Sequence, residues 1–292
     1  MQKILLDTDI GSDIDDSIAL TYLLCQPACE LVGITTVSGE PEKRAQLASA
    51  ICRAAGKEIP IFAGTGEPIL TKQLQPRAPQ ADDLSAWPHE TAFAPNGAVT
   101  FMRDIICQNP GEITLLAIGP LTNVALLFLT YPETAKLLKS VVLMSGNFYN
   151  KLDMPMSEWN VRCDPFASKV VYDNRDVKAL YAVGLDATLQ VKLRPQEVYA
   201  RFTAPVLAPV LPYVEKWCAC CDGTVTFHDP LAAACLFDDT LCGFARGTVE
   251  VETTSERCGG VTYFTPSENG RHFVAETVDA ARFFEHYFSI VK

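Results

Sequence analysis

Short apolar runs alternate along the chain with segments whose apolar residues recur at helical spacing. The apolar, often β-branched runs predict strands at residues 4–6, 31–37, 59–63, 113–118, 141–144 and 179–183. Helical spacing appears in Ile18, Ala19, Tyr22 and Leu23, and again in residues 121–129 and 167–172. This alternation predicts βαβ units around a parallel sheet, and nearly continuous apolar strands are typical of a sheet covered on both faces.

The later part of the chain has a different pattern. Residues 247–253 and 260–264 alternate as antiparallel strands do, and residues 278–287 predict a C-terminal helix. Residues 67–96 are rich in proline and polar side chains, which predicts a long surface loop. We therefore expect an α/β fold with one domain over residues 1–292. Its open, mostly parallel central sheet is flanked by helices, with a few antiparallel strands near the C-terminus.

Composition and charge restrict the partners that we expect. The 292 residues are 48% hydrophobic and 20% charged, which suits a globular protein with a large core. The formal net charge is −11 and no Lys/Arg cluster occurs, so we expect no nucleic-acid partner. Residues 1–7 do not resemble a secretory signal, and the apolar runs are too short to span a bilayer. We expect a cytoplasmic protein with no membrane partner, whose eleven cysteines are mostly reduced and packed as small hydrophobic residues.

Polar segments follow several of the predicted strands. They comprise residues 7–16, 38–40, 118–123 and 145–160. In open α/β sheets, ligands bind outside the carboxyl ends of the strands. These segments therefore predict one site at that edge of the sheet.

The first polar segment contains five aspartates, which are Asp7, Asp9, Asp13, Asp15 and Asp16. One or two could cap a helix, but five are too many for capping. Carboxylates this close raise one another's pKa unless a cation neutralises them. Calcium and magnesium prefer oxygen ligands. The segment therefore predicts a hard divalent cation and a hydrolase that activates water.

Two other acidic motifs do not fit this segment. An EF-hand loop starting at Asp7 needs Gly at its sixth and Glu at its twelfth position, where this chain has Ser12 and Ile18. A phosphotransferase of the haloacid dehalogenase type would carry Thr or Val where Gly11 stands. The metal-dependent hydrolase remains the better interpretation.

Four matches in family order make the chain resemble the inosine–uridine-preferring nucleoside hydrolase family. They comprise Asp7-Thr8-Asp9-Ile10-Gly11 with Asp15-Asp16, then Ile34-Thr35-Thr36-Val37-Ser38-Gly39, then Ile118-Gly119-Pro120-Leu121-Thr122-Asn123, and finally Glu158-Trp159-Asn160 with Asp164-Pro165 and His228-Asp229-Pro230-Leu231. Each match alone is weak, but the ordered set is specific. The resemblance implies hydrolysis of the N-glycosidic bond of ribonucleosides with a bound calcium ion, and it allows a homo-oligomer.

The resemblance also implies a role for individual residues. Asp9 would be a metal ligand and the general base, and Asp16 and Asp229 would be further ligands together with the backbone carbonyl of Ile118. The ribose hydroxyls would be held by Asp15, Asn150, Glu158 and Asn160. His228 would lie near the nucleobase. We expect Asp7 to shape the acidic segment from behind, and Asn123 to cap or brace the helix after Pro120.

Three departures from the family pattern leave alternatives open. Two extra residues precede the Asp15-Asp16 pair, so Asp13 could replace Asp15 at the sugar. Glu40 stands where the family commonly has Asn near the ribose. The spacing before Glu158 is longer than usual, which makes Asn147 a rival of Asn150.

Two alternative functions follow from these departures. Glu40 leaves open a hydrolase of the same fold that acts on another N-ribosyl compound. A non-catalytic nucleoside-binding protein is a different class, but simple binding needs no water-activating carboxylates. The chain also lacks a glycine-rich phosphate cradle and a local Arg/Lys cluster, which favours nucleosides over nucleotides.

Overall fold

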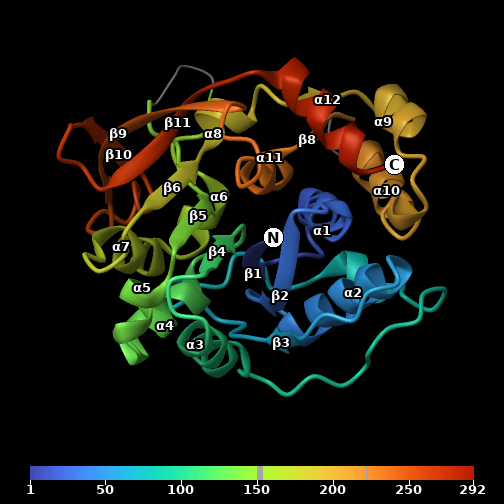
Figure 1. Cartoon of the computed structure of the whole chain (residues 1–292), viewed down its shortest axis with the longest axis horizontal. Helices are drawn as coiled ribbons and strands as arrows, with labels where there is room; N and C mark the ends of the chain where they lie inside the picture. The colour runs from blue at the N-terminus through green and yellow to red at the C-terminus, as the bar shows by residue number, and fades with distance from the viewer. Residues whose placement is uncertain (150–153, 221–222) are drawn as a thin grey trace.

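The computed structural model describes residues 1–149, 154–220 and 223–292, and a nine-stranded sheet runs through it (Figure 1). The strand order is β10-β9-β11-β6-β5-β4-β1-β2-β3. Their bounds are β1 Gln2–Thr8, β2 Cys29–Thr36, β3 Ile61–Ala63, β4 Ile113–Ala117, β5 Ser140–Met144, β6 Leu180–Val183, β9 Cys242–Val251, β10 Thr262–Pro266 and β11 His272–Val278. In this spatial order, the neighbouring strands from β11 through β6, β5, β4, β1 and β2 to β3 pair in parallel. Strand β9 pairs antiparallel with both β10 and β11. The predicted mostly parallel sheet with antiparallel C-terminal strands is confirmed.

Helices cover both faces of this sheet (Figure 1). Two short strands, β7 Lys192–Leu193 and β8 Val225–Thr226, form a separate pair. The helices are α1 Asp15–Cys25, α2 Pro41–Ala54, α3 Ala98–Gln108, α4 Thr122–Thr130, α5 Glu133–Leu137, α6 Trp159–Cys163, α7 Pro165–Asp173, α8 Leu185–Thr188, α9 Pro195–Arg201, α10 Leu211–Cys220, α11 His228–Ala234 and α12 Ala280–Ile290, with 3₁₀ turns at Pro79–Asp82 and Pro205–Leu207. Among the described residues, no helix has the length and apolarity needed to cross a membrane.

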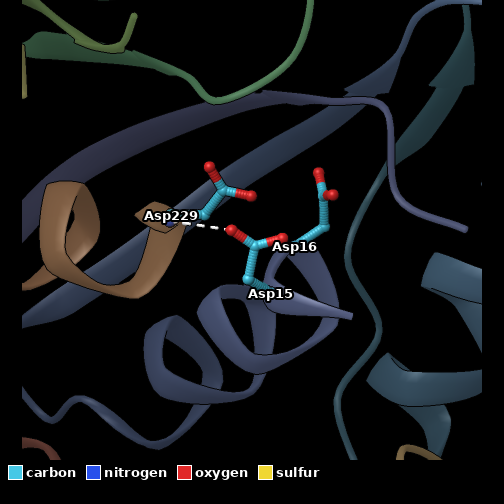
Figure 2. A group of neighbouring side chains, drawn as sticks. All are labelled: Asp15, Asp16 and Asp229. Atoms are coloured by element: carbon cyan, nitrogen blue, oxygen red, sulfur yellow. Dashed lines mark hydrogen bonds between the residues drawn. The ribbon is translucent and has the colours of Figure 1, made fainter. Parts of the chain in front are cut away.

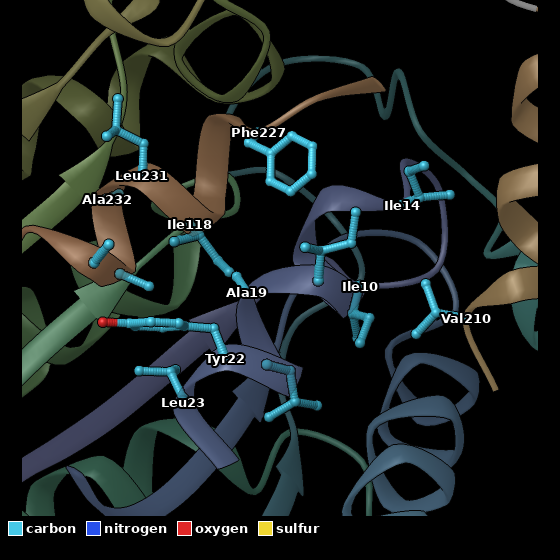
Figure 3. Packing of buried hydrophobic residues seen from close by; sticks show 14 of the residues in the cluster. Ile10, Ile14, Ala19, Tyr22, Leu23, Ile118, Val210, Phe227, Leu231 and Ala232 are labelled. Atoms are coloured by element: carbon cyan, nitrogen blue, oxygen red, sulfur yellow. The ribbon is translucent and has the colours of Figure 1, made fainter. Parts of the chain in front are cut away.

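Side chains of β1 belong to two separate apolar cores. Ile4 and Leu6 pack with α1, α2, α11 and α12, whereas Leu5 packs with α3, α4 and α7 on the other face. Alternation along a strand sends successive side chains to opposite faces, so one apolar run supplies both cores. Figure 3 shows the first core where α1 meets α11. This packing brings residue 229 beside residues 15 and 16.

Some predictions failed in detail. Strand β11 was not predicted, although it joins the parallel part of the sheet to the antiparallel part. Residues 67–96 form a loop, as predicted, apart from the 3₁₀ turn at Pro79–Asp82; the loop is not wholly at the surface, because Ala78 is fully buried and the 3₁₀ turn packs near α2. Backbone groups of this segment bond to the acidic segment: Gln80 N donates to Gly11 O at 3.0 Å, and Arg77 O accepts from Ser12 Oγ at 3.3 Å. The single domain over residues 1–292 stays a prediction.

Candidate functional site

A cavity of about 550 Å³ lies at the carboxyl edge of the sheet. It is lined by most of the site residues that the sequence predicts, from both ends of the chain. They are Asp9, Asp13, Asp15, Asp16, Ile118, Glu158, Asn160, His228 and Asp229. The fold therefore gathers at one place the polar segments that follow different strands.

Three carboxylates form the centre of this group (Figure 2). Asp15, Asp16 and Asp229 each offer an oxygen, and these oxygens lie within 4.8 Å of one another. The Asp229 backbone N–H donates to Asp15 Oδ2 at 3.3 Å, and Thr8 Oγ1 donates to Asp16 Oδ1 at 2.5 Å. All three aspartates lie in the first turns of α1 and α11, where the helix dipole favours negative charge.

Burial raises the pKa of Asp15, Asp16 and Asp229 well above that of a free aspartate, and the neighbouring carboxylates raise it further. Buried carboxylates with oxygens at this spacing are the donors that a hard divalent cation prefers. The residues therefore fit a metal site. The group includes Asp15, which the resemblance assigns to the sugar, and does not include Asp9.

Asp9 follows β1 and is held from two sides. Its Oδ2 accepts a hydrogen bond from Gln75 Nε2 at 2.5 Å. On the other side, a Cβ added to Gly119 would lie only 2.7 Å from Asp9 Oδ1, so the chain after β4 passes directly against this carboxylate. Burial raises the pKa of Asp9, while the charge of Arg44 opposes that rise.

Arg44 of α2 is a fully buried cation that the sequence did not reveal as part of the site. Its guanidinium donates to the backbone carbonyls of Asp9, of Ile10 at 3.1 Å and of Arg77 at 3.1 Å, and Nε donates to Gly39 O at 2.8 Å. Because arginine presents several donors in a fixed plane, one side chain can fix three segments together. In the sequence, Arg44 is one of several basic residues in an amphipathic helix, and no local pattern distinguishes it from the others.

Asp7 and Asn123 support the acidic segment from behind. Asn123 Nδ2 donates to Asp7 Oδ1 at 2.8 Å and to Thr36 O at 3.0 Å, and Asn123 Oδ1 accepts from Thr65 N at 3.1 Å. Thr35 Oγ1 also donates to Asp7 Oδ1, at 2.6 Å. Burial raises the pKa of Asp7 to about 7. Asn123 thus braces β1 and β2 and the chain after β3, in addition to its place in α4.

The side chains of Glu158 and Asn160 are bound to the backbone. Glu158 caps α6, accepting from the N–H groups of Asn160 at 2.6 Å, Val161 at 3.1 Å and Gly146 at 3.2 Å. Asn160 Nδ2 donates to Ile118 O at 2.8 Å, the carbonyl that we expected on the metal. Burial raises the pKa of Glu158 to about 7, against these three N–H groups. Both side chains line the cavity in a fixed orientation.

His228 lines the cavity beside the carboxylates, at the start of α11. Its Nδ1 forms a 2.7 Å hydrogen bond with Thr188 Oγ1. Burial lowers the pKa of His228 to about 4, helped by the charge of Lys192, so the imidazole is neutral near pH 7. Leu185, Leu189 and Trp217 line the cavity as well and give it an apolar wall.

Two predicted residues, Glu40 and Asn147, do not join this group. Glu40 does not line the cavity, because its carboxylate accepts from Ala78 N at 2.9 Å and pairs with Lys43 at 2.9 Å. The structure thus does not bring Glu40 to the sugar, where we expected it. Asn150 lies outside the described residues. Its rival Asn147 is buried, donates from Nδ2 to Pro155 O at 2.7 Å and does not line the cavity.

Comparison with known proteins finds similarity over most of the chain. The model of the family described as "Inosine-uridine preferring nucleoside hydrolase" matches residues 4–285. "Probable uridine nucleosidase 1" of Oryza sativa subsp. japonica is 32% identical over 275 residues, covering 86% of this chain and 81% of the relative. "Non-specific ribonucleoside hydrolase RihC" of Salmonella paratyphi C (strain RKS4594) is 31% identical over 270 residues, covering 89% and 86%.

Solved structures agree on the fold. A structure titled "Plant nucleoside hydrolase - PpNRh1 enzyme" superposes with a TM-score of 0.85 at 24% identity, covering 99% of this chain and 98% of the other. A "Purine-Preferring Ribonucleoside Hydrolase from Gardnerella vaginalis" gives the same TM-score, identity and coverage. At this identity the likeness supports the architecture alone.

Proposed function

The chain belongs to the inosine-uridine preferring nucleoside hydrolase family, and from this premise we propose how its cavity hydrolyses the N-glycosidic bond of ribonucleosides to ribose and free base. One observation carries the proposal. The buried carboxylates of Asp9, Asp15 and Asp16 share a cavity with that of Asp229, more than two hundred residues away in sequence. Simple binding of a neutral nucleoside would not require so many buried acids.

Calcium is the cation that we propose for this site. Asp9, Asp16 and Asp229 are the carboxylate ligands that the resemblance implies, and the 4.8 Å spacing of Asp15, Asp16 and Asp229 supports adding Asp15 to them. Asp9 and the carbonyl of Ile118 line the same cavity and complete the proposed set. When bound, a divalent cation offsets the charge of these acids and lowers the pKa of a water molecule.

Asp9 is the proposed general base. Its carboxylate lines the cavity and can accept the proton that the attacking water loses as it adds to the anomeric carbon. As the glycosidic bond to the nucleobase breaks, positive charge develops on the sugar ring. The surrounding carboxylates stabilise that charge because they are fixed in a largely water-excluded site.

The proposed sugar contacts are Glu158, Asn160 and one of Asp13 and Asp15. Each ribose hydroxyl can both donate and accept, which suits carboxylate and amide groups. Backbone hydrogen bonds hold Glu158 and Asn160 in place before substrate enters, so little ordering is needed on binding. Asn150 remains a predicted contact.

The nucleobase is proposed to lie along the apolar wall of Leu185, Leu189 and Trp217. Because Thr188 forms a hydrogen bond with Nδ1 of His228, Nε2 is the nitrogen that we propose to contact the departing nucleobase. Replacing His228 with Ala should slow substrates with poor leaving groups most. A small reduction in rate that is equal for nucleosides with different nucleobases would show that His228 does not contact the nucleobase.

The proposed substrate is a nucleoside without a 5′-phosphate. We propose that the protein acts in the cytoplasm without nucleic-acid or membrane partners, and that any assembly it forms is a homo-oligomer. Among the described residues, the cavity lining holds several acids and one arginine, Arg162, so the acids around it would oppose the binding of a phosphate. Glu40 was the residue that favoured another ribosyl compound, and it does not line the cavity.

The test is product analysis with the wild-type enzyme and an Asp9→Asn variant. Wild-type protein should release ribose and base from inosine or uridine in equal amounts. The Asp9→Asn change removes the general base and one negative charge, so it should lower kcat by roughly a thousandfold while the fold is kept. Near-wild-type activity of Asp9→Asn would exclude Asp9 as the base, and no ribose from any nucleoside would refute the function.

A further inference from the structure

Gln75 connects the proposed base to the opposite side of the cavity. It lies in residues 67–96, whose composition predicts only a loop, and it lines the cavity together with Asp9 and Trp159. Its Nε2 donates to Asp9 Oδ2 at 2.5 Å, and its Oε1 accepts from Trp159 Nε1 at 2.7 Å. We propose that Gln75 is the positioning residue for Asp9, an inference that rests on the proposed role of Asp9 as base.

The chemistry of the two partners fixes the orientation of the Gln75 amide. An indole N–H can only donate, so the oxygen of Gln75 must face Trp159. The amide nitrogen then faces Asp9, whose ionised carboxylate can only accept. Reversing the amide would break both hydrogen bonds. Gln75 is thus held between a donor and an acceptor and presents its N–H to one oxygen of the base.

This contact restricts the Asp9 carboxylate. Oδ2 is engaged by Gln75, and Oδ1 lies against the chain at Gly119, where an added Cβ would be 2.7 Å away. Rotation of the carboxylate would break a charge-assisted hydrogen bond, which is stronger than a hydrogen bond between neutral groups. A base held in one orientation needs no reordering when the proton moves, which is the advantage that a preorganised site provides.

The backbone around Gln75 is anchored to the turn between β2 and α2. An added Cβ on Gly39 would collide with the backbone of Gln75 and Pro76, so the two segments touch directly. Glu40 Oε2 accepts from Ala78 N at 2.9 Å, and Arg44 donates to Arg77 O at 3.1 Å. Glu40 therefore acts on the site through residues 75–78 and not through the sugar.

Glu40 adopts a backbone conformation that supports this role. Its φ is +56°, in the left-handed region that costs free energy for a residue with a side chain. Ser38, two residues earlier, has a φ of +75°. Such strain persists only where surrounding contacts fix it, and here the Ala78 N–H and Lys43 fix the Glu40 carboxylate.

The variant that tests the proposal is Gln75→Met, which keeps the length of the side chain and removes the amide. With calcium and a saturating nucleoside, kcat should fall tenfold to a hundredfold, the usual effect of removing a partner that orients an active-site ligand. KM should change less than about threefold, because Gln75 is not assigned to substrate. A raised KM with unchanged kcat would overturn the proposal and place Gln75 on the nucleoside.

A double-mutant cycle asks whether Gln75 acts through Asp9. In an Asp9→Asn background, Gln75→Met should cause little further loss of kcat, since the base it orients is already gone. An equal loss in both backgrounds would overturn the proposal. Trp159→Phe is the matched control on the other side: it keeps a ring, removes the N–H, and should lower kcat in the same direction by less than Gln75→Met does.

A crystal structure of Gln75→Met separates this inference from the proposed function. The Asp9 carboxylate should turn away from its wild-type orientation, and an unchanged orientation would overturn the positioning role whatever the activity. If wild-type protein hydrolyses nucleosides and Asp9→Asn does not, while Gln75→Met keeps full kcat, only the inference about Gln75 fails. If no protein releases ribose, the proposed function fails.

Discussion

Removal of divalent cations should destabilise the folded protein as well as inactivate it. The oxygens of Asp15, Asp16 and Asp229 lie within 4.8 Å of one another and are buried. At that distance, two unit negative charges repel by about 3.5 kcal/mol at an effective dielectric constant of ~20. Without a cation the folded state must bear this repulsion or bind protons, whereas unfolding separates Asp229 from the adjacent Asp15 and Asp16.

The expected size of the effect follows from binding linkage. Calcium at one hundred times its dissociation constant should stabilise the fold by about 2.7 kcal/mol. Unfolding entropy of about 2.1 cal/mol/K per residue, over 292 residues, converts this into a rise in Tm of about 4 °C. Differential scanning calorimetry of chelator-treated protein, with and without added calcium, measures the shift.

The matched control for this experiment is Asp229→Asn, which removes one charge from the group and keeps the shape of the side chain. Its calcium-dependent shift should shrink or vanish, while its Tm in chelator should match or exceed that of the wild type, because repulsion is relieved. The reasoning is refuted if wild-type protein, freed of metal by chelator, shows the same Tm with and without calcium.

Three further predictions concern Arg44, the buried His272 and the choice of substrate. Arg44→Met should lower the free energy of unfolding by about 3–5 kcal/mol in denaturant titrations, because four backbone carbonyls lose a buried cationic donor; a loss below about 1 kcal/mol would contradict this. Burial lowers the pKa of His272, whose Nδ1 accepts from Val249 N, so the stability it contributes is complete above about pH 6.5 and falls at lower pH; His272→Phe should flatten that fall between pH 7 and 5. Inosine should be cleaved far faster than inosine monophosphate, and comparable kcat/KM values would disprove the preference for nucleosides.

The architecture could be predicted from sequence because every strand of the nine-stranded sheet except β11 had a local signal. In β1, β4 and β5, apolar residues are consecutive, as expected for strands covered on both faces. By contrast, β11 contains His272, Glu276 and Thr277 among its apolar residues and runs almost directly into α12, so it has no clear pattern of its own. Its place in the sheet depends on pairing with β6 and β9, which are distant in sequence.

The site could be predicted only where chemistry is concentrated in short motifs. The aspartates of residues 7–16 are conspicuous as a group, whereas Gln75 and Arg44 are single residues in ordinary surroundings. Their importance comes from tertiary contacts with Asp9, which no local pattern encodes. Glu40 was misplaced for the same reason: the resemblance fixes its position in the chain, but the Ala78 N–H fixes the direction of its carboxylate.

We propose that the acidic cavity hydrolyses nucleosides with the help of a divalent cation. The most direct measurement is the amount of free ribose and free base released from a panel of purine and pyrimidine nucleosides by metal-depleted protein, before and after calcium is restored. The account predicts no release without metal, and equal amounts of ribose and base once calcium is added. Release that is unaffected by chelator, or no ribose from any nucleoside in calcium, would contradict it.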